Sequence, residues 1–128
     1  MIYLDTSVAL AELFAEDRRP PPGFWKEQLV SSRLLEYEVW TRLQARHAGA
    51  SHREAAREIL GAVATVELAP TVLARAIEPF PVPVWTRDAM HLATALFLSE
   101  RRQQVAVATY DVRMAAAARA VGLDVVEP

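Results

Sequence analysis

The sequence of 128 residues contains no cysteine, and this absence excludes disulfide bonds, thiolate catalysis and cysteine-ligated zinc. Its three histidines, His47, His52 and His91, lack the close spacing of metal ligands. With four glycines in all, the chain also has no glycine-rich phosphate-binding loop. Any metal ion would therefore be a hard cation held by carboxylate oxygens.

Long apolar segments are missing as well. No apolar run approaches the ~20 residues that span a bilayer, and no basic segment followed by an apolar stretch indicates a secretion signal. We therefore expect a cytoplasmic protein with no membrane partner. The content of 52% hydrophobic and 23% charged residues predicts one globular domain over residues 1–128. Because the net charge is −2, nucleic-acid binding would require a local basic patch.

Short apolar runs alternate with segments of helical spacing along the chain. The expected strands are residues 2–4, 29–31, 65–68, 104–109 and 124–126. The expected helices are residues 8–14, 33–47, 52–62, 70–77, 86–98 and 112–121. The proline runs at 20–22 and 79–83 predict surface loops. The alternation is typical of an α/β fold, in which helices cover both faces of a parallel sheet.

Several expected helices carry signals at their ends. Ser32 and Ser51 are expected N-caps, and Glu54 completes a capping box with Ser51. Asp111 is expected to open the last helix, and Gly122 to end it.

Three aspartates stand where strands are expected to give way to helices. Asp5 and Asp111 each follow a buried strand, and Asp88 lies in the first turn of a helix. Each aspartate alone is explained as an N-cap or as a partner of the helix dipole. At one edge of a parallel sheet, however, all three would form a negative pocket, and a bound cation would relieve its repulsion. The pattern therefore favours a site for Mg²⁺ or Mn²⁺.

A fourth acid is expected from the helix over residues 33–47. Both Glu36 and Glu38 border apolar residues of this helix, so periodicity does not separate them. Arg42, four residues after Glu38, offers that glutamate a simple ion pair as the alternative to a site role.

Taken in order, these residues resemble the PIN domain, and within it the small VapC-type toxins of VapBC toxin–antitoxin pairs. The resemblance covers nearly the whole chain. Its segments are Leu4-Asp5-Thr6-Ser7, the stretch from Ser32 to Glu38, Asp88-Ala89-Met90-His91-Leu92-Ala93-Thr94-Ala95 and Thr109-Tyr110-Asp111. The third segment is the most specific of the four.

The resemblance implies a three-layer α/β/α fold with a central parallel sheet. It also implies a Mg²⁺- or Mn²⁺-dependent endoribonuclease, a homodimer and a cognate antitoxin. The family's catalytic acids fall on Asp5, Glu38, Asp88 and Asp111, with the three aspartates as metal ligands. The family's serine, six residues before its glutamate, falls on Ser32 and thereby selects Glu38 over the other glutamate.

Further residues carry weaker signals. Thr6 and Thr109 fall on polar positions beside the family's acids. His91, one turn after Asp88, is interpreted as a packed histidine that donates a hydrogen bond. Two arginines close to the acids in sequence, Arg42 and Arg113, rank highest for contacts with RNA phosphates. The other arginines considered for such contacts are Arg46, Arg87, Arg101 and Arg102.

Several large apolar side chains indicate an interface with a partner. A small domain does not easily bury as many large apolar residues as Trp40, Trp85 and Phe97, and exposed apolar patches usually mark interfaces. The sequence thus supports a dimer or an antitoxin contact.

Two rival functions are open at this point. A phospho-acceptor receiver domain also binds Mg²⁺ through aspartates at strand ends. It needs a lysine after a late strand, however, and the only lysine here is Lys26. The second rival is a catalytically silent PIN-like domain that binds RNA or protein. The presence of all four acids favours the enzyme.

Overall fold

The structure is a computed structural model that describes residues 1–101 and 103–128. Arg102, one of the arginines considered for phosphate contact, lies outside the described residues. No helix in the described part of the chain has the length and apolar character to cross a bilayer.

Five parallel strands form a sheet in the order β3-β2-β1-β4-β5. The strands are β1 (Ile2–Leu4), β2 (Leu29–Ser32), β3 (Val63–Val66), β4 (Ala106–Ala108) and β5 (Asp124–Val126). The first strand is central, because Tyr3 pairs with Val30 on one side and with Val107 on the other. The strand order reverses between β1 and β4. In open α/β sheets, ligands bind at the carboxyl ends of the strands at such a reversal.

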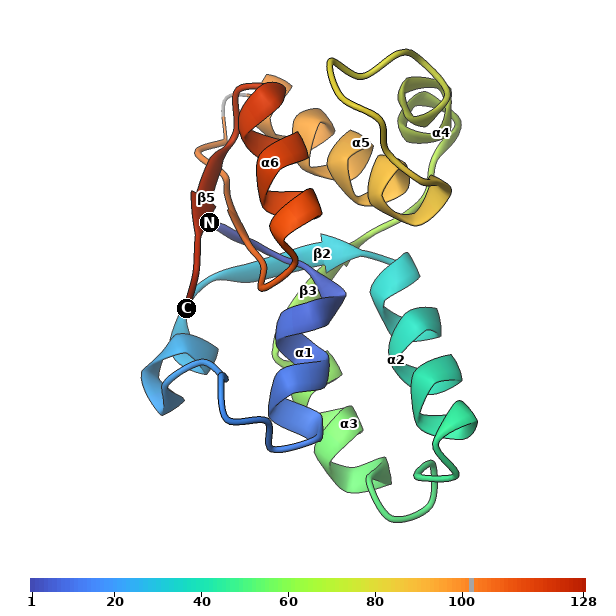
Figure 1. The fold of residues 1–128 in the computed structure, drawn as a ribbon, viewed down its shortest axis with the longest axis vertical. Coiled ribbons are helices and arrows are strands. Elements are labelled where there is room, and N and C mark those ends of the chain that lie inside the picture. The colour runs from blue at the N-terminus through green and yellow to red at the C-terminus, as the bar shows by residue number, and fades with distance from the viewer. Residues whose placement is uncertain (102) are drawn as a thin grey trace.

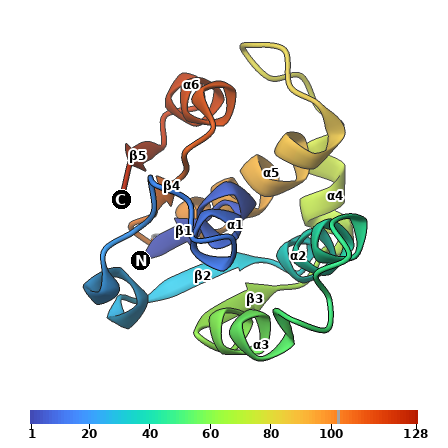
Figure 2. The ribbon, with the colours of Figure 1, turned by 60° about the horizontal axis from the view of Figure 1, so that its bottom comes forward.

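Helices cover both faces of this sheet (Figure 1). One layer contains α1 (Thr6–Leu13), α2 (Leu34–Ala45) and α3 (Arg53–Gly61). The other contains α5 (Thr86–Glu100) and α6 (Val112–Ala120), with α4 (Pro70–Ala76) packed against α5. Figure 2 shows α1 over the centre of the sheet and α3 beside β3. The expected α/β fold with a central parallel sheet is therefore confirmed.

The two faces of β1 build two separate cores. Leu4 is fully buried among residues of α1, α2 and α3, whereas Tyr3 is fully buried among residues of α5 and α6. Successive side chains of a strand point to opposite faces. A strand covered on both faces therefore needs apolar residues at every position, and Ile2-Tyr3-Leu4 meets this need.

A short 3-10 helix, η1 (Pro22–Lys26), forms at the end of the first proline run. Pro22 stands at the first position of this helix, where a fixed φ is favourable and no N–H is needed. Phe24 is 7% exposed and joins the α1–α3 core, so it anchors the segment.

The predicted capping box at Ser51 is wrong. The Ser51 hydroxyl donates to the carbonyl of Ala48 at 3.2 Å and lies 2.8 Å from His52 Nδ1. The helix begins after His52, which is the N-cap without a side-chain hydrogen bond. The preceding turn therefore uses the hydroxyl that was expected to cap the helix.

Boundaries of other elements also shifted. The third strand is Val63–Val66 rather than 65–68, because it pairs in register with β2 from Leu29 to Ser32. The helix expected over 33–47 ends at Ala45, and His47 adopts a left-handed φ of 54°. Tertiary pairing and turn geometry decide these ends, and periodicity does not reveal them.

Candidate active site

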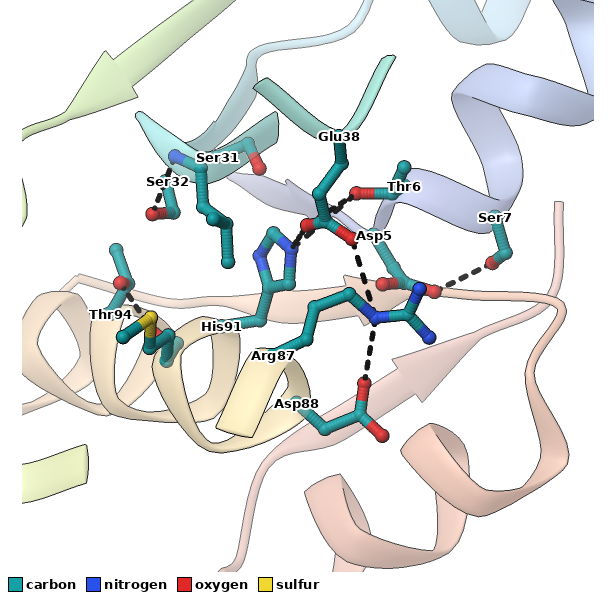
Figure 3. Close-up of polar contacts among 12 residues, drawn as sticks. Asp5, Thr6, Ser7, Ser31, Ser32, Glu38, Arg87, Asp88, His91 and Thr94 are labelled. Carbon is teal, nitrogen blue, oxygen red and sulfur yellow. Dashed lines mark hydrogen bonds and ion pairs between the residues drawn. The ribbon is translucent and has the colours of Figure 1, made fainter. Parts of the chain in front are cut away.

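The candidate site lies where the chain leaves β1 and β4 and where α5 begins. Asp5 follows β1, Asp111 follows β4, and Asp88 lies in the first turn of α5. Glu38 comes from α2, which runs beside this edge (Figure 3). The fold thus brings acids from four elements to the carboxyl edge of the sheet.

Asp5 is held by side chains and does not cap its helix. It occupies the N-cap position of α1, yet its carboxylate makes no capping hydrogen bond. Instead Oδ2 accepts hydrogen bonds from the hydroxyls of Ser7 at 2.6 Å and Thr109 at 2.7 Å. The residue is 5% exposed. The simple capping explanation of Asp5 therefore fails, and its second oxygen has no hydrogen bond among the described residues.

Asp111 does cap its helix. Its Oδ1 accepts from the backbone N–H groups of Arg113 at 2.8 Å and Met114 at 3.2 Å. Its own backbone N–H donates to Thr109 Oγ1 at 3.0 Å. Because the same hydroxyl donates to Asp5, Thr109 joins the ends of β1 and β4.

Glu38 is fixed through one oxygen only. Its Oε1 accepts from Thr6 Oγ1 at 3.0 Å and contacts His91 Nε2 at 2.5 Å. Its Oε2 is buried and has no hydrogen-bond partner in the described part of the chain. Arg87 Nε lies 3.3 Å from this oxygen, so the guanidinium supplies charge there without hydrogen-bonding geometry. The side chain of Glu38 is 12% exposed.

A buried chain of hydrogen bonds orients His91. The backbone N–H of Ser32 donates to the Tyr3 hydroxyl at 3.1 Å, and that hydroxyl lies 2.7 Å from His91 Nδ1. Burial raises the pKa of Tyr3, so its hydroxyl stays protonated and can donate to the imidazole. The network assigns Nε2 as the protonated nitrogen, which then donates to Glu38. His91 is fully buried, as expected for a packed histidine that donates a hydrogen bond.

Sequence reasoning missed Tyr3 and Ser7. Tyr3 was counted only as an apolar strand residue, although a buried tyrosine hydroxyl usually needs a partner. Ser7 Oγ donates to Asp5 and accepts from the backbone N–H of Tyr110 at 3.0 Å. A polar residue two positions after a strand-end aspartate was the available signal.

Asp88 is the least constrained of the acids. No hydrogen bond to its side chain is present among the described residues, and its Oδ1 lies 3.7 Å from Arg87 Nε. Burial is the main cause that raises the pKa of Asp88, and the charges of Asp5 and Asp111 raise it further. The Arg87 charge is the strongest opposing influence. The charges of Asp5 and Asp111 thus act on the carboxyl group of Asp88.

The chain matches the family model of the PIN domain over residues 2–120. The chain belongs to the PIN domain family. It is 30% identical to "Ribonuclease VapC47" of Mycobacterium tuberculosis (strain CDC 1551 / Oshkosh) over 135 residues, covering 100% of this chain and 97% of the relative. A solved structure described as a toxin–antitoxin complex from Klebsiella pneumoniae has the same fold, with a TM-score of 0.59 at 17% identity. The alignment covers 100% of this chain and 98% of that chain.

Other residues considered for the PIN domain site lie outside this cluster. Glu36 forms an ion pair with Arg33 at 3.1 Å, whereas Glu38 enters the acidic site. Arg42 and Arg113 are exposed, and neither makes an ion pair with a site acid in the described part of the chain. The proposed pairing of Arg42 with Glu38 is thus replaced by the pairing of Arg87 with Glu38.

The acids of this PIN domain fit a divalent cation by chemistry. Carboxylate oxygens are the donors that Mg²⁺ and Mn²⁺ prefer, and the buried Oε2 of Glu38 is an acceptor without a donor. Within residues 1–101 and 103–128, however, no three acidic or histidine side chains are grouped closely enough to hold one ion. The assignment of Asp5, Asp88 and Asp111 as ligands therefore stays a prediction.

Proposed function

We propose that this PIN domain is a Mg²⁺- or Mn²⁺-dependent endoribonuclease that acts in the cytoplasm as the toxin of a type II toxin–antitoxin pair. The proposal treats residues 1–128 as a single domain. It is supported by the similarity to a relative named ribonuclease and by a fold shared with a protein from a toxin–antitoxin complex.

The observation that carries the proposal is the way Asp5 and Glu38 are held. Each acid has one oxygen fixed by donors from other elements, and its second oxygen receives no hydrogen bond from the described residues. Structural carboxylates usually have their acceptors satisfied. A carboxylate with one oxygen fixed by hydrogen bonds and one without a hydrogen bond is suited to binding a cation.

Each acid has a distinct role in this proposal. Asp5, Asp88 and Asp111 would hold the cation directly or through water, and Glu38 would hold it or orient the attacking water. A divalent cation at this edge would lower the pKa of a bound water and stabilise charge on the phosphodiester. Thr6 and Thr109 fix the carboxylates of Glu38 and Asp5 before any substrate binds.

Exposed residues outside the acidic site are the candidates for contacts with RNA and with a protein partner. The exposed guanidinium groups of Arg42 and Arg113 are the candidates for RNA phosphates. Trp85 and Ile77 are 75% and 88% exposed, and such apolar exposure is suited to a homodimer or antitoxin interface. An arginine of the antitoxin could neutralise the acidic site in the complex.

The test is a cleavage assay on total cellular RNA with and without Mn²⁺. We expect cleavage only with the metal, and no cleavage by the Glu38→Gln variant. Retained cleavage by that variant would count against the assigned site.

A second experiment tests the toxin role. Expression of the chain alone should slow growth, and co-expression of the neighbouring small open reading frame should restore growth and yield a complex in size-exclusion chromatography. If the protein is strictly monomeric, does not slow growth and forms no complex with the neighbouring gene product, the toxin role is wrong. The proposed nuclease activity would not be affected by that result.

The alternative is a catalytically silent PIN-like domain that binds RNA or protein. The contact of Arg87 with both Glu38 and Asp88 favours this alternative, because a guanidinium among the acids opposes cation binding. Absence of metal-dependent cleavage together with retained RNA binding would establish it.

A further inference from the structure

Arg87 lies between two of the acids that the proposed function requires. Its Nε is 3.3 Å from Oε2 of Glu38 on α2 and 3.7 Å from Oδ1 of Asp88 on its own helix, α5. Figure 3 shows the guanidinium projecting between the two carboxylates, with dashed lines from Nε to each. One cation thus bridges acids from two different elements.

The charge balance explains why a cation is present there. Asp5 and Asp111 act on Asp88 as like charges, and Arg87 is the strongest charge that opposes them. Within the described residues, Arg87 supplies the guanidinium that contacts two of the site acids.

The contact is suited to exchange. A tight arginine–carboxylate pair uses two parallel N–H bonds, but here Nε makes both contacts and leaves Glu38 Oε2 without a hydrogen bond. The Arg87 side chain is 50% exposed, whereas those of Glu38 and Asp88 are 12% and 13% exposed. The guanidinium can therefore move into water without unpacking the core, while the acids stay in place.

We propose that Arg87 is an internal counterion of the acidic site, and that it competes with the divalent cation for Glu38 and Asp88. The inference rests on the proposed function, since it takes the cation to bind these acids. A divalent ion near Nε would repel the guanidinium and replace its neutralising charge. Arg87 then sets the cation concentration at which the site becomes loaded, and its release allows the acids to gather around one ion.

Metal affinity, rather than activity, is the decisive measurement. A freed guanidinium could also bind the RNA phosphate, so activity alone would mix two effects. Calorimetric titration with Mn²⁺ should compare the natural protein with Arg87→Gln and Arg87→Lys. Arg119→Gln is the matched control, because it removes one positive charge at the far, exposed end of α6.

We expect Arg87→Gln to bind Mn²⁺ roughly three- to tenfold more tightly, in keeping with the loss of one partly exposed ion pair. Arg87→Lys should fall between this variant and the natural protein, and Arg119→Gln should change little. Equal or weaker binding by Arg87→Gln, with measurable binding by the natural protein, overturns the role of Arg87 and leaves the proposed nuclease standing. No Mn²⁺ binding by any variant overturns both.

A measurement on the natural protein keeps the proposal testable if Arg87→Gln does not fold. Arginine Nε–H signals in ¹⁵N–¹H spectra can be followed during titration with Mg²⁺, and the Arg87 signal can be assigned from its absence in Arg87→Lys. We expect this signal to move towards the position of a free guanidinium as the site fills. A signal that stays fixed while Mg²⁺ saturates the protein overturns the competition.

Discussion

Asp5 and Asp111 occupy the same position in two βα units, yet the protein holds them differently. Asp5 follows the central strand β1 and receives hydroxyl donors from Ser7 and from Thr109 of the neighbouring unit. Asp111 follows β4 and accepts the N–H groups of its own helix. A strand-end aspartate therefore either caps its helix or is held by side chains, according to its neighbours, and the motif position alone does not distinguish the two.

The same contrast extends to the other two acids. Glu38 is fixed by Thr6 and by the buried His91, whereas Asp88 has no side-chain hydrogen bond among the described residues. Asp5 and Glu38 thus form a rigid half of the site, and Asp88 belongs to an adjustable half. In the proposed metal-dependent reaction, the first half would keep its geometry while the second half responds to the cation.

Replacing Asp5 by Asn tests the rigid half and should have the largest effect. The amide oxygen can still accept from Ser7 and Thr109, so the metal-free fold should be unchanged or slightly more stable as repulsion falls. Cleavage dependent on Mn²⁺ should fall by at least about 100-fold, since even outer partners of a metal site are worth roughly 10–100-fold. Binding of Mn²⁺ that matches the natural protein in calorimetry would count against Asp5 as a ligand.

Tyr3→Phe tests whether the rigid half depends on the buried chain of hydrogen bonds. The change keeps the ring but leaves the Ser32 N–H and His91 Nδ1 without a partner. We expect the free energy of unfolding to fall by about 1–3 kcal/mol, measured by urea denaturation. A Tyr110→Phe variant is the control, because among the described residues the Tyr110 hydroxyl donates to the carbonyl of Pro128 and to no site residue. An equal loss in both variants would contradict a special role for the Tyr3 hydroxyl.

Two substitutions of Asp111 separate its cap from its charge. Asn caps helices about as well as Asp, so Asp111→Asn should retain stability, whereas Asp111→Ala should lose about 1 kcal/mol in thermal or chemical unfolding. If the charge serves the site, both variants should lose Mn²⁺-dependent cleavage. If Asp111→Asn cleaves RNA as fast as the natural protein, Asp111 serves as a helix cap and not as a metal ligand.

The smallest expected effect is a change in the stability of the metal-free protein when Asp88 is replaced. Its pKa is raised by burial, so the native state holds this proton more tightly than the unfolded state does. Stability should therefore fall as pH rises from the usual aspartate pKa through the raised value, and the full penalty should persist at neutral pH. Asp88→Asn should raise the melting temperature slightly at pH 7 in EDTA, and this gain should vanish below the usual aspartate pKa. A gain that is independent of pH would point to a cause other than ionisation.

Much of the architecture was accessible from the sequence because each signal was local. The apolar run Ile2-Tyr3-Leu4 predicted a strand covered on both faces, and the alternation of strands and helices predicted the parallel sheet. Gly122 was predicted to end the last helix, and its φ of 85° at the end of α6 agrees with that role. The capping box at Ser51 failed because the hydroxyl found a partner in the preceding turn.

The sequence by itself determined which strands and helices form and which acids lie near their ends, because apolar runs and helical periodicity mark these elements even where their exact ends shift. Only the tertiary structure decided what each carboxylate does there. The pairing of β1 with β4 brings Thr109 to Asp5, and the packing of α5 against the sheet brings His91 and Arg87 to Glu38. Such contacts join residues between 49 and 104 positions apart, a separation that no local pattern encodes.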